Sequence, residues 1–285
     1  MNVSVVILTL NAEKEIEGLL QILLEQTIEP CEIIVIDSQS DDETETICER
    51  YCPKVSCIPI LRSGFDHGRT RAQAMDYSQG EFVLFLTQDA LPVDKHYIEN
   101  LLLPFQDPAV AMVTGRQIAR EQASPIEKRV RQFNYPPESH VRTQKDIPVL
   151  GIKAFFASNV CSAYRRSAYF AAGGFESPIV TNEDMLMAAG FLAAGYKIAY
   201  CAEAQVFHSH NFNLKQQFVR NYNIGIFMRR YANAFRGVST SSEGRKLVKY
   251  VLSHLLKEKH FLLAAYFCIE CAVKMLAYLS GLFRA

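Results

Sequence analysis

The chain has 285 residues, 49% of them hydrophobic and 21% charged, and its 30 basic residues balance its 30 acidic residues. This composition is typical of an average globular protein, so it excludes a disordered chain, a collagen and a long coiled coil. The length predicts one large domain or two modest ones.

Short apolar segments alternate with helical patterns over the first 114 residues. We expect strands at 3–8, 32–37, 55–60, 81–86 and 109–114. We expect helices near 16–23, 40–51, 68–77 and 94–103, the second of them opened by a capping box from Ser40 to Glu43. Continuous apolar strands are usually buried on both faces. The alternation therefore predicts an α/β fold with a mostly parallel central sheet and helices on both faces.

The regular alternation stops at residue 116. Four prolines divide residues 116–153 into expected loops and short helices, a pattern typical of a mobile segment near a ligand. The later expected elements are a strand at 159–164, a turn at 173–174, a helix at 181–194, short strands at 197–200 and 204–207, and helices at 214–231 and over most of 243–283.

Cysteine usage and hydropathy give two further expectations. The eight cysteines accompany no signal-peptide pattern, so we expect free thiols in a reducing cytoplasm. Cys268 and Cys271 form half of a zinc motif without a matching pair, which favours buried or lipid-facing thiols. The apolar stretch 261–283 is interrupted by Glu270 and Lys274, and its charge-free pieces fall short of the ~20 residues of a membrane span.

Polar residues follow the ends of several expected strands. The first strand is followed by Thr9, Asn11 and Glu13, the second ends at Asp37, and the fourth is followed by Asp89. His208 and His210 follow the last strand. In open parallel sheets the ligand lies outside the carboxyl ends of the strands, so these side chains are expected on one rim. The sequence contains neither GxGxxG nor GxxxxGK[ST], so it indicates neither a dinucleotide fingerprint nor a P-loop.

Each of these residues also has a purely structural interpretation. Asn11 is suited to cap a helix, and Thr181-x-x-Asp184 has the form of a capping box. The acids after Asp37 are favourable in the first turn of a helix, and the two histidines could face solvent. Taken singly, the structural interpretation is favoured; taken together in this order, the residues favour a functional site.

The ordered set resembles glycosyltransferase family 2, the inverting sugar-nucleotide transferases with the GT-A fold. The resemblance runs from residue 3 to about residue 230 through VSVVILTLNAEKEI, IIVIDSQSDDET, GRTRAQAMDYSQGEFVLFLTQDALP, the segment from GGFESP to GYKIAY, and VFHSH. The pieces FDHGRTR, TQDA and HSHN look most like the rhamnosyltransferase branch. The resemblance implies transfer of L-rhamnose from dTDP-rhamnose.

The resemblance assigns a donor side. Thr9, Asn11 and Glu13 match positions that hold the nucleoside, and Asp37 matches the acid that accepts a hydrogen bond from the pyrimidine N3–H. Ser38 stands where the family often has a second acid. Arg71 matches a basic residue beside the donor diphosphate, where a cation is favourable.

The resemblance also implies a divalent cation, Mg²⁺ or Mn²⁺, as cofactor. Thr87-Gln88-Asp89 stands in the place of the family's Asp-x-Asp, so the first acid is missing. Asp89 and His208 are the implied metal ligands, and an imidazole favours Mn²⁺ over Mg²⁺. With one carboxylate, we expect weak metal binding without donor.

On the acceptor side, Glu183 and Asp184 match the family's acid pair. An inverting transfer needs a base for the proton of the acceptor hydroxyl, and we assign this role to Asp184. Glu183 is expected to orient the acceptor or the following helix.

The expected organisation is a GT-A domain at 1–235 and a basic, apolar helical region at 236–285. Residues 244–285 carry seven basic and two acidic residues, interleaved with leucine and valine. This region fits either a helical pair packed on the domain or an interfacial contact with an anionic membrane. We therefore expect the enzyme in the cytoplasm or at the inner face of the cell membrane, with no nucleic-acid partner.

The expected partners are a nucleotide-sugar donor and a glycan or lipid-linked sugar acceptor of cell-surface polysaccharide synthesis. The same chemistry with a UDP-hexose or UDP-N-acetylhexosamine donor is the alternative, since Ser38 and Thr87 do not settle the base or sugar. A pyrophosphorylase would need a glycine-rich basic loop, which residues 9–13 lack. A non-catalytic nucleotide-binding scaffold is less favoured because all four of the key acids and histidine are present: Asp37, Asp89, Asp184 and His208.

Overall fold

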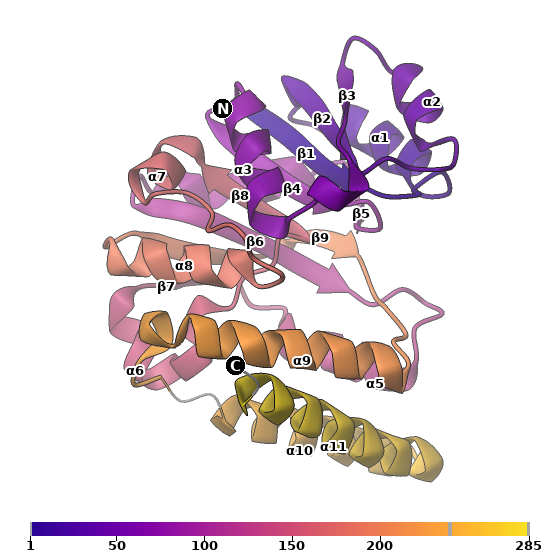
Figure 1. The fold of residues 1–285 in the computed structure, drawn as a ribbon, viewed down its shortest axis with the longest axis vertical. Helices are drawn as coiled ribbons and strands as arrows, with labels where there is room; N and C mark the ends of the chain where they lie inside the picture. The colour runs from indigo at the N-terminus through magenta and orange to yellow at the C-terminus, as the bar shows by residue number, and fades with distance from the viewer. Residues whose placement is uncertain (1, 239–240, 284–285) are drawn as a thin grey trace.

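The structure, a computed structural model, describes residues 2–238 and 241–283. At its centre lies a nine-stranded sheet in the order β3-β2-β1-β4-β8-β6-β9-β5, with β7 paired to β9 (Figure 1). The strands are β1 (Val3–Thr9), β2 (Glu32–Asp37), β3 (Val55–Pro59), β4 (Phe82–Thr87), β5 (Leu91–Pro92), β6 (Val110–Ile118), β7 (His140–Arg142), β8 (Cys161–Arg165) and β9 (Lys197–Phe207). β1 to β4 are parallel, β8 runs antiparallel between β4 and β6, and β6 is parallel to β9. The predicted mostly parallel α/β sheet is confirmed.

Two helical layers cover the two faces of this sheet. α1 (Ile16–Leu24), α2 (Thr44–Glu49) and α4 (Tyr97–Leu102) pack on one face; α3 (His67–Tyr77), α7 (Arg166–Ala171) and α8 (Glu183–Ala193) pack on the other. Alternate residues of one strand serve the two layers, since Val5 and Ile7 belong to the first core and Val6 to the second. All three are fully buried, which is why these strands are apolar at most positions.

Both expected capping boxes are wrong. The helix expected from residue 40 begins at Thr44, because the Ser40 hydroxyl donates to Asp37 instead of capping it. The helix expected from residue 181 begins at Glu183 after Asn182, whose φ of 62° is left-handed and whose side chain caps nothing. Ser40 thus holds the loop after β2, and the Thr181 hydroxyl donates to the side-chain oxygen of Asn182 instead of closing a capping box.

The segment expected to be irregular contains more structure than its prolines indicate. It holds α5 (Pro125–Asn134), β7 and α6 (Ile147–Leu150). Pro125 is at the start of α5, where the missing N–H costs nothing. The two short strands expected at 197–207 are one strand, β9, with a register shift between Gly115 and Arg116 of β6. The 3₁₀ turns are Arg62–Gly64, Leu103–Gln106, Gln144–Asp146, Gly151–Phe155 and Ala232–Phe235.

The C-terminal helices form a further layer. α11 (Phe261–Phe283) lies along α9 (Leu214–Arg230), and α10 (Ser241–Lys257) packs on α5 and α11 (Figure 1). Their shared core joins Ile126 of α5 to Val251, Leu255 and Phe267. The helical pair is thus packed on the preceding chain. The boundary between 1–235 and 236–285 stays a prediction.

By length and composition, α11 is able to cross a membrane, which corrects the expectation drawn from its two charges. Glu270 and Lys274 form an ion pair one turn apart on this helix. Glu270 is buried and also accepts a hydrogen bond of 3.2 Å from Gln217 of α9, so the charges turn toward the protein.

Candidate active site

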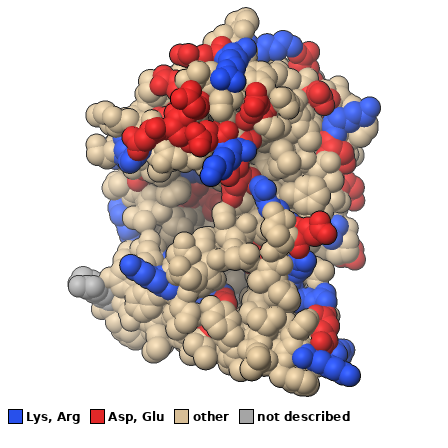
Figure 2. All heavy atoms as spheres, turned by 90° about the vertical axis from the view of Figure 1, so that its right-hand side faces the viewer, with Lys and Arg blue, Asp and Glu red and all other residues tan. Residues whose placement is uncertain are grey.

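A cavity of about 700 Å³ opens at the carboxyl ends of β4 and β9. Figure 2 shows this face of the molecule hollowed at mid-height, with acidic side chains gathered above the hollow. The cavity is lined mainly by polar and charged residues: Glu15, Thr87, Gln88, Asp89, Gln117, Arg120, Arg131, Tyr135, Ser158, Val160, His208, Ser209, His210, Phe212 and Arg220. Its place agrees with the ligand position expected for an open parallel sheet.

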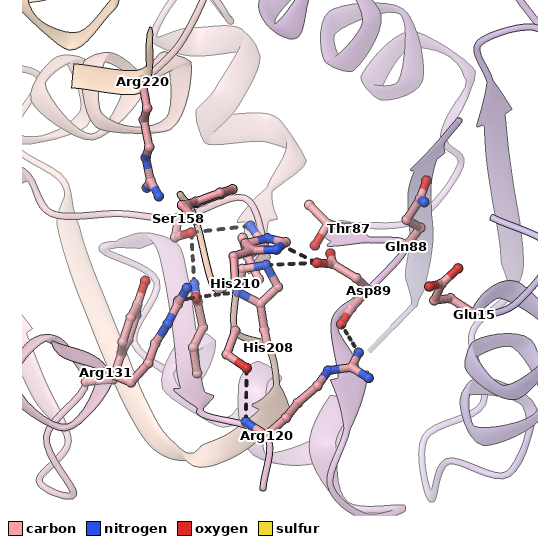
Figure 3. A pocket seen from close by; sticks show the side chains of 15 residues that line it. Glu15, Thr87, Gln88, Asp89, Arg120, Arg131, Ser158, His208, His210 and Arg220 are labelled. Carbon is pink, nitrogen blue, oxygen red and sulfur yellow. Dashed lines mark hydrogen bonds and ion pairs between the residues drawn. The ribbon is translucent and has the colours of Figure 1, made fainter. Parts of the chain in front are cut away.

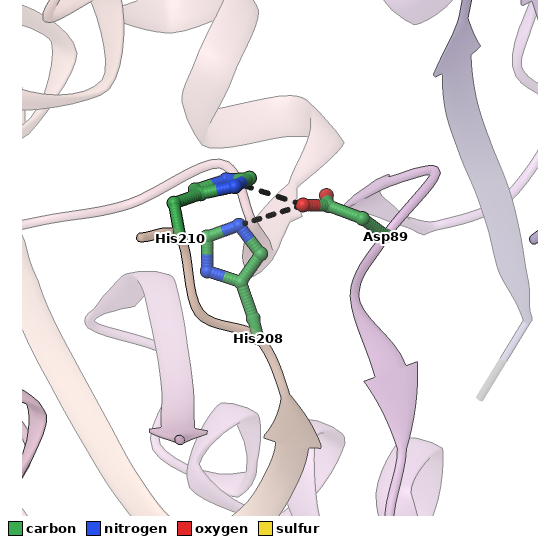
Figure 4. Close-up of side chains that lie close together, drawn as sticks. All are labelled: Asp89, His208 and His210. Atoms are coloured by element: carbon green, nitrogen blue, oxygen red, sulfur yellow. Dashed lines mark ion pairs between the residues drawn. The ribbon is translucent and has the colours of Figure 1, made fainter. Parts of the chain in front are cut away.

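Asp89, His208 and His210 converge inside this cavity (Figures 3 and 4). The Nε2 atoms of His208 and His210 lie 3.3 Å and 3.2 Å from the same oxygen of Asp89. Burial raises the pKa of Asp89, but the hydrogen bond and charge of His208 outweigh it, so the carboxyl is ionised far below neutral pH. Burial lowers the pKa of both histidines.

Gln117 on β6 fixes which nitrogen of His208 carries the proton. The Gln117 carbonyl oxygen accepts a hydrogen bond from Arg131, so it also accepts from Nδ1–H of His208 at 2.9 Å. With Nδ1 protonated, a neutral His208 directs its Nε2 lone pair at the Asp89 carboxylate, an arrangement that is repulsive unless a proton on Nε2 or a metal cation lies between them. The residues present therefore fit a metal ion, and the carboxylate–imidazole donor set suits Mn²⁺.

The loops after β1 and β2 are tied together at the adjoining rim. The Asp37 carboxylate is buried and accepts hydrogen bonds from the hydroxyls of Thr9 and Ser40, at 2.8 Å and 2.6 Å. Asn11, whose φ is 53°, accepts from the Asp41 amide at 2.9 Å, and the Glu13 amide donates to Asp42. Asn11 therefore joins the two loops and does not cap a helix. The structure brings together four of the predicted donor-side residues, Thr9, Asn11, Glu13 and Asp37.

Arg71 lies elsewhere. It is on α3, is absent from the described residues that line the cavity, and its guanidinium is 3.1 Å from Glu183. Both side chains are only 6% exposed. Its contact with a donor diphosphate stays a prediction, whereas its ion pair with Glu183 is part of the structure.

Glu183 and Asp184 occupy the start of α8, behind the segment that holds Ser158. The backbone amide of Asn159 donates to Asp184 at 2.9 Å, and its side-chain amide donates to Glu183 at 3.0 Å. Burial raises the pKa of Asp184 to about 7, and the neighbouring charge of Glu183 acts in the same direction. Burial also raises the pKa of Glu183, but the charge of Arg71 outweighs it and holds the pKa below its usual value.

Several residues of this site have no role in the sequence-based prediction. His210 completes the Asp89 cluster, Gln117 and Asn159 orient its neighbours, and Arg131 and Arg220 reach into the cavity. The spacing His-x-His was a usable signal for His210, because alternate residues of an extended segment can point the same way. No sequence pattern marks the other four.

Residues 4–170 match the model of the family described as glycosyl transferase family 2. The chain belongs to glycosyltransferase family 2. It is 42% identical over 244 residues to the O-antigen chain rhamnosyltransferase WbaN of Salmonella anatum, covering 83% of this chain and 75% of that protein. It is 39% identical over 269 residues to the O-antigen chain rhamnosyltransferase RfbN of Salmonella typhimurium, covering 92% and 83%.

Solved glycosyltransferases share the fold. The mannosyltransferase PcManGT from Pyrobaculum calidifontis, in complex with GDP-Man and Mn²⁺, matches with a TM-score of 0.67 at 18% identity over 99% of this chain and 87% of that one. TarS 1–349 of S. aureus matches with a TM-score of 0.61 at 20% identity over 90% and 72%. The predicted GT-A fold and membership of the rhamnosyltransferase-like branch of family 2 are confirmed. The family 2 protein is thus a glycosyltransferase of polysaccharide synthesis that acts on a nucleotide-sugar donor and a glycan acceptor.

Proposed function

We propose that this glycosyltransferase moves L-rhamnose from dTDP-rhamnose, with inversion, to a hydroxyl of a lipid-linked glycan. Support for the sugar comes from the 42% and 39% identity to two proteins named rhamnosyltransferases over most of the chain. The roles that follow are assigned from the geometry of the site.

The nucleoside binds at the rim made by the loops after β1 and β2. One oxygen of Asp37 accepts two hydroxyl hydrogen bonds, while the other accepts only the Ser40 amide at 2.7 Å. That second oxygen has capacity left for the N3–H of thymine. Asn11 and Glu13 extend the same rim toward the ribose.

Asp89 and His208, joined by His210, hold a divalent cation, with Mn²⁺ favoured. When bound, such an ion neutralises charge on the diphosphate as it leaves the sugar. The chain's own contribution is orientation, because Gln117 holds the His208 ring with Nε2 facing Asp89. Thr87 stands where the family has its first acid, and the two imidazoles supply metal ligands in place of that acid.

Asp184 is the base. The acceptor oxygen attacks the anomeric carbon from the face opposite the diphosphate, its proton passes to Asp184, and the bond from carbon to diphosphate oxygen breaks. A pKa of about 7 lets the carboxylate accept that proton and release it again near neutral pH. Glu183 stays ionised against Arg71 and fixes the start of α8.

One observation carries this assignment: a continuous path of contacts joins the metal-binding cluster to the base. His208 contacts Gln117, whose amide donates to the Ser158 hydroxyl at 2.9 Å. The next residue, Asn159, donates its amide to Asp184. A cation-binding group and a base held on one short path are what a metal-assisted sugar transfer requires.

The enzyme is further proposed to sit at the cytoplasmic face of a membrane. One side of α11 exposes a row of large apolar residues seven positions apart: Leu262, Ile269, Leu276 and Phe283. The neighbouring α10 exposes Lys246, Lys249 and Lys257. An apolar row flanked by lysines fits the surface of an anionic bilayer.

A donor screen tests the function. Purified protein is heated with dTDP-rhamnose, UDP-glucose or UDP-N-acetylglucosamine, each with Mn²⁺ or with EDTA. A ligand at 100 times its Kd stabilises the fold by ~2.7 kcal/mol, so the true donor gives the largest shift. We expect that shift from dTDP-rhamnose with Mn²⁺.

A larger rise in melting temperature with a UDP-sugar would identify that UDP-sugar as the donor and leave the proposed reaction unchanged. Equal shifts in Mn²⁺ and EDTA would remove the metal from the proposal. Binding of dTDP-rhamnose without sugar transfer to any lipid-linked acceptor would favour a nucleotide-binding scaffold.

A further inference from the structure

A second hollow adjoins the active-site cavity beside His210. The second hollow also has a volume of about 700 Å³ and lies among α5, α9, α10 and α11. Both hollows are lined by the same five residues, Arg131, Tyr135, His210, Phe212 and Arg220. The two hollows therefore adjoin at these five residues.

Arg220 stands at this junction without a counter-charge. Its guanidinium lies 5.6 Å from the centre of the Phe212 ring, and it forms no hydrogen bond or ion pair with any described residue. Arg131 differs, since Glu127 is 2.7 Å away and matches its charge. Arg220 as a whole is an exposed residue. Desolvation of its guanidinium and the charge of Arg131 lower its pKa, whereas the charges of Tyr135, Glu127 and Asp184 raise it.

In the second hollow, apolar side chains lie beside Gln217 and the ion pair of Glu270 and Lys274. They include Ile224, Leu247, Leu263 and Tyr266 from α9, α10 and α11. These helices lead to the surface that carries the exposed apolar row of α11. The hollow thus runs from a cation at the active site to the apolar side of the molecule.

We propose that Arg220 binds a phosphate group of the acceptor, and that the second hollow receives the apolar chain attached to that phosphate. The acceptor class is a glycan carried on a lipid diphosphate, and the inference rests on the proposed function. The planar guanidinium accommodates two phosphate oxygens at once, and the adjacent Arg131 adds positive charge. The aromatic and aliphatic walls exclude water from the chain.

The donor diphosphate is a second possible source of phosphate, and the geometry places it elsewhere. Its nucleoside rim, with Asp37 and Thr9, lies at the ends of β1 and β2, and its metal ligand Asp89 follows the adjacent β4. Arg220 enters from α9 on the opposite side of His208 and His210 (Figure 3).

Binding to the full chain in EDTA tests the inference without any sugar transfer. Calorimetry compares farnesyl diphosphate, inorganic pyrophosphate and farnesol. Farnesyl diphosphate should bind more tightly than either of the others, because only it satisfies both the cation and the apolar walls. R220Q should weaken the binding of farnesyl diphosphate and of pyrophosphate by about tenfold or more.

Two further variants separate the phosphate from the chain. I224Q should weaken the binding of farnesyl diphosphate and leave that of pyrophosphate unchanged, since Ile224 is an apolar lining residue of the second hollow and is not among the described residues that line the first. K215Q, which removes an exposed charge from the same helix α9, should change neither.

Unchanged farnesyl diphosphate binding in R220Q would overturn the phosphate site. Equal binding of farnesyl diphosphate and pyrophosphate by the unaltered chain would overturn the chain channel. A loss of dTDP binding in Mn²⁺ as large as the loss of farnesyl diphosphate would move Arg220 to the donor side and overturn the acceptor assignment. Because no donor sugar enters these measurements, they stand whichever sugar the enzyme transfers.

Discussion

At the level of single residues, two adjacent carboxylates of α8 hold their protons with different strength. Both are buried, and burial raises the pKa of each. The guanidinium of Arg71 faces Glu183 and reverses the effect there, while Asp184 has the charge of Glu183 beside it. The pKa values of the two groups are therefore pushed apart. Glu183 stays ionised as a fixed charge, while Asp184 can exchange a proton.

The pH dependence of turnover should follow Asp184. A base works in its ionised form, so kcat should rise with pH through the pKa of about 7. D184N should lose this rise and lower kcat by ~10²–10⁴-fold while still binding donor. D76N, which alters an exposed acid on α3, is the matched control and should keep the wild-type profile. Wild-type kcat in D184N would leave Asp184 with a structural role only.

Removing the Glu183 carboxylate should leave Arg71 buried without an anionic partner, although its hydrogen bonds to His67 remain. E183Q should lower the free energy of unfolding by ~3 kcal/mol, measured by urea denaturation. E99Q breaks the exposed pair with His96 and should cost less than ~1 kcal/mol. E183Q should also move the midpoint of the pH–kcat curve to lower pH, because the charge that raises the pKa of Asp184 is gone. Equal costs for both variants would contradict a buried ion pair.

Gln117 should matter for metal affinity although it touches no metal. Q117L removes the acceptor that orients His208, and Mn²⁺ affinity measured by electron paramagnetic resonance with dTDP present should fall by ~10–100-fold. Q117E keeps an acceptor at the same place and should restore most of the affinity. If Q117L and the unaltered chain bind Mn²⁺ equally, the ring of His208 is oriented by other contacts.

At the level of elements, α9 and α11 approach closely at a glycine pair. A Cβ atom on Gly225 would lie 2.3 Å from the carbonyl oxygen of Tyr278, and one on Gly281 would lie 2.2 Å from that of Tyr222. Helix backbones pack this closely only where side chains are absent from the crossing. The glycines therefore fix α11 on α9 and hold the walls of the second hollow.

G225A should separate these helices and lower the free energy of unfolding by ~1–3 kcal/mol, measured by urea denaturation. G244A is the control on α10, since a Cβ there meets nothing within 4 Å. That substitution should raise the free energy of unfolding by up to ~1 kcal/mol, because alanine has a higher helix propensity than glycine. A neutral G225A would show that the crossing tolerates a methyl group.

At the level of the whole molecule, the site lies between a sheet that holds the nucleotide rim and a helical layer whose outer side is apolar (Figure 1). The segment 244–285 is basic while the rest of the chain carries the excess of acids. We predict that this charge asymmetry orients the helical layer toward an anionic surface.

Vesicle co-sedimentation tests this orientation. The full chain should bind anionic vesicles at low salt and less at high salt, because salt screens the lysines but not the apolar contact. L276E should weaken binding, since Leu276 is 63% exposed in the apolar row of α11. L61E is the control, because Leu61 is exposed but lies outside α10 and α11. It should bind vesicles as the unaltered protein does. No binding at low salt would end the membrane proposal.

The sequence alone determined the sheet and the class of chemistry. Buried strands such as β1 and β2 are visible in the sequence because most of their positions are apolar, a local pattern that burial on both faces imposes. Family motifs then placed Asp37, Asp89 and Asp184, since each follows or precedes an element at a recognisable spacing. The capping boxes failed because the Ser40 hydroxyl bonds to Asp37 and the Thr181 hydroxyl bonds to Asn182, so neither accepts from a backbone amide of the helix.

Only the tertiary structure decided how these residues work together. Gln117 meets His208 and Arg71 meets Glu183 across 91 and 112 positions of the chain, distances at which no local pattern reports a contact. The pKa of Asp184 depends on burial and on a neighbouring charge, which exist only once α8 packs on β8 and α3. The unmatched charge of Arg220 is likewise a property of the folded cavity, because an arginine in sequence carries no record of which acids surround it.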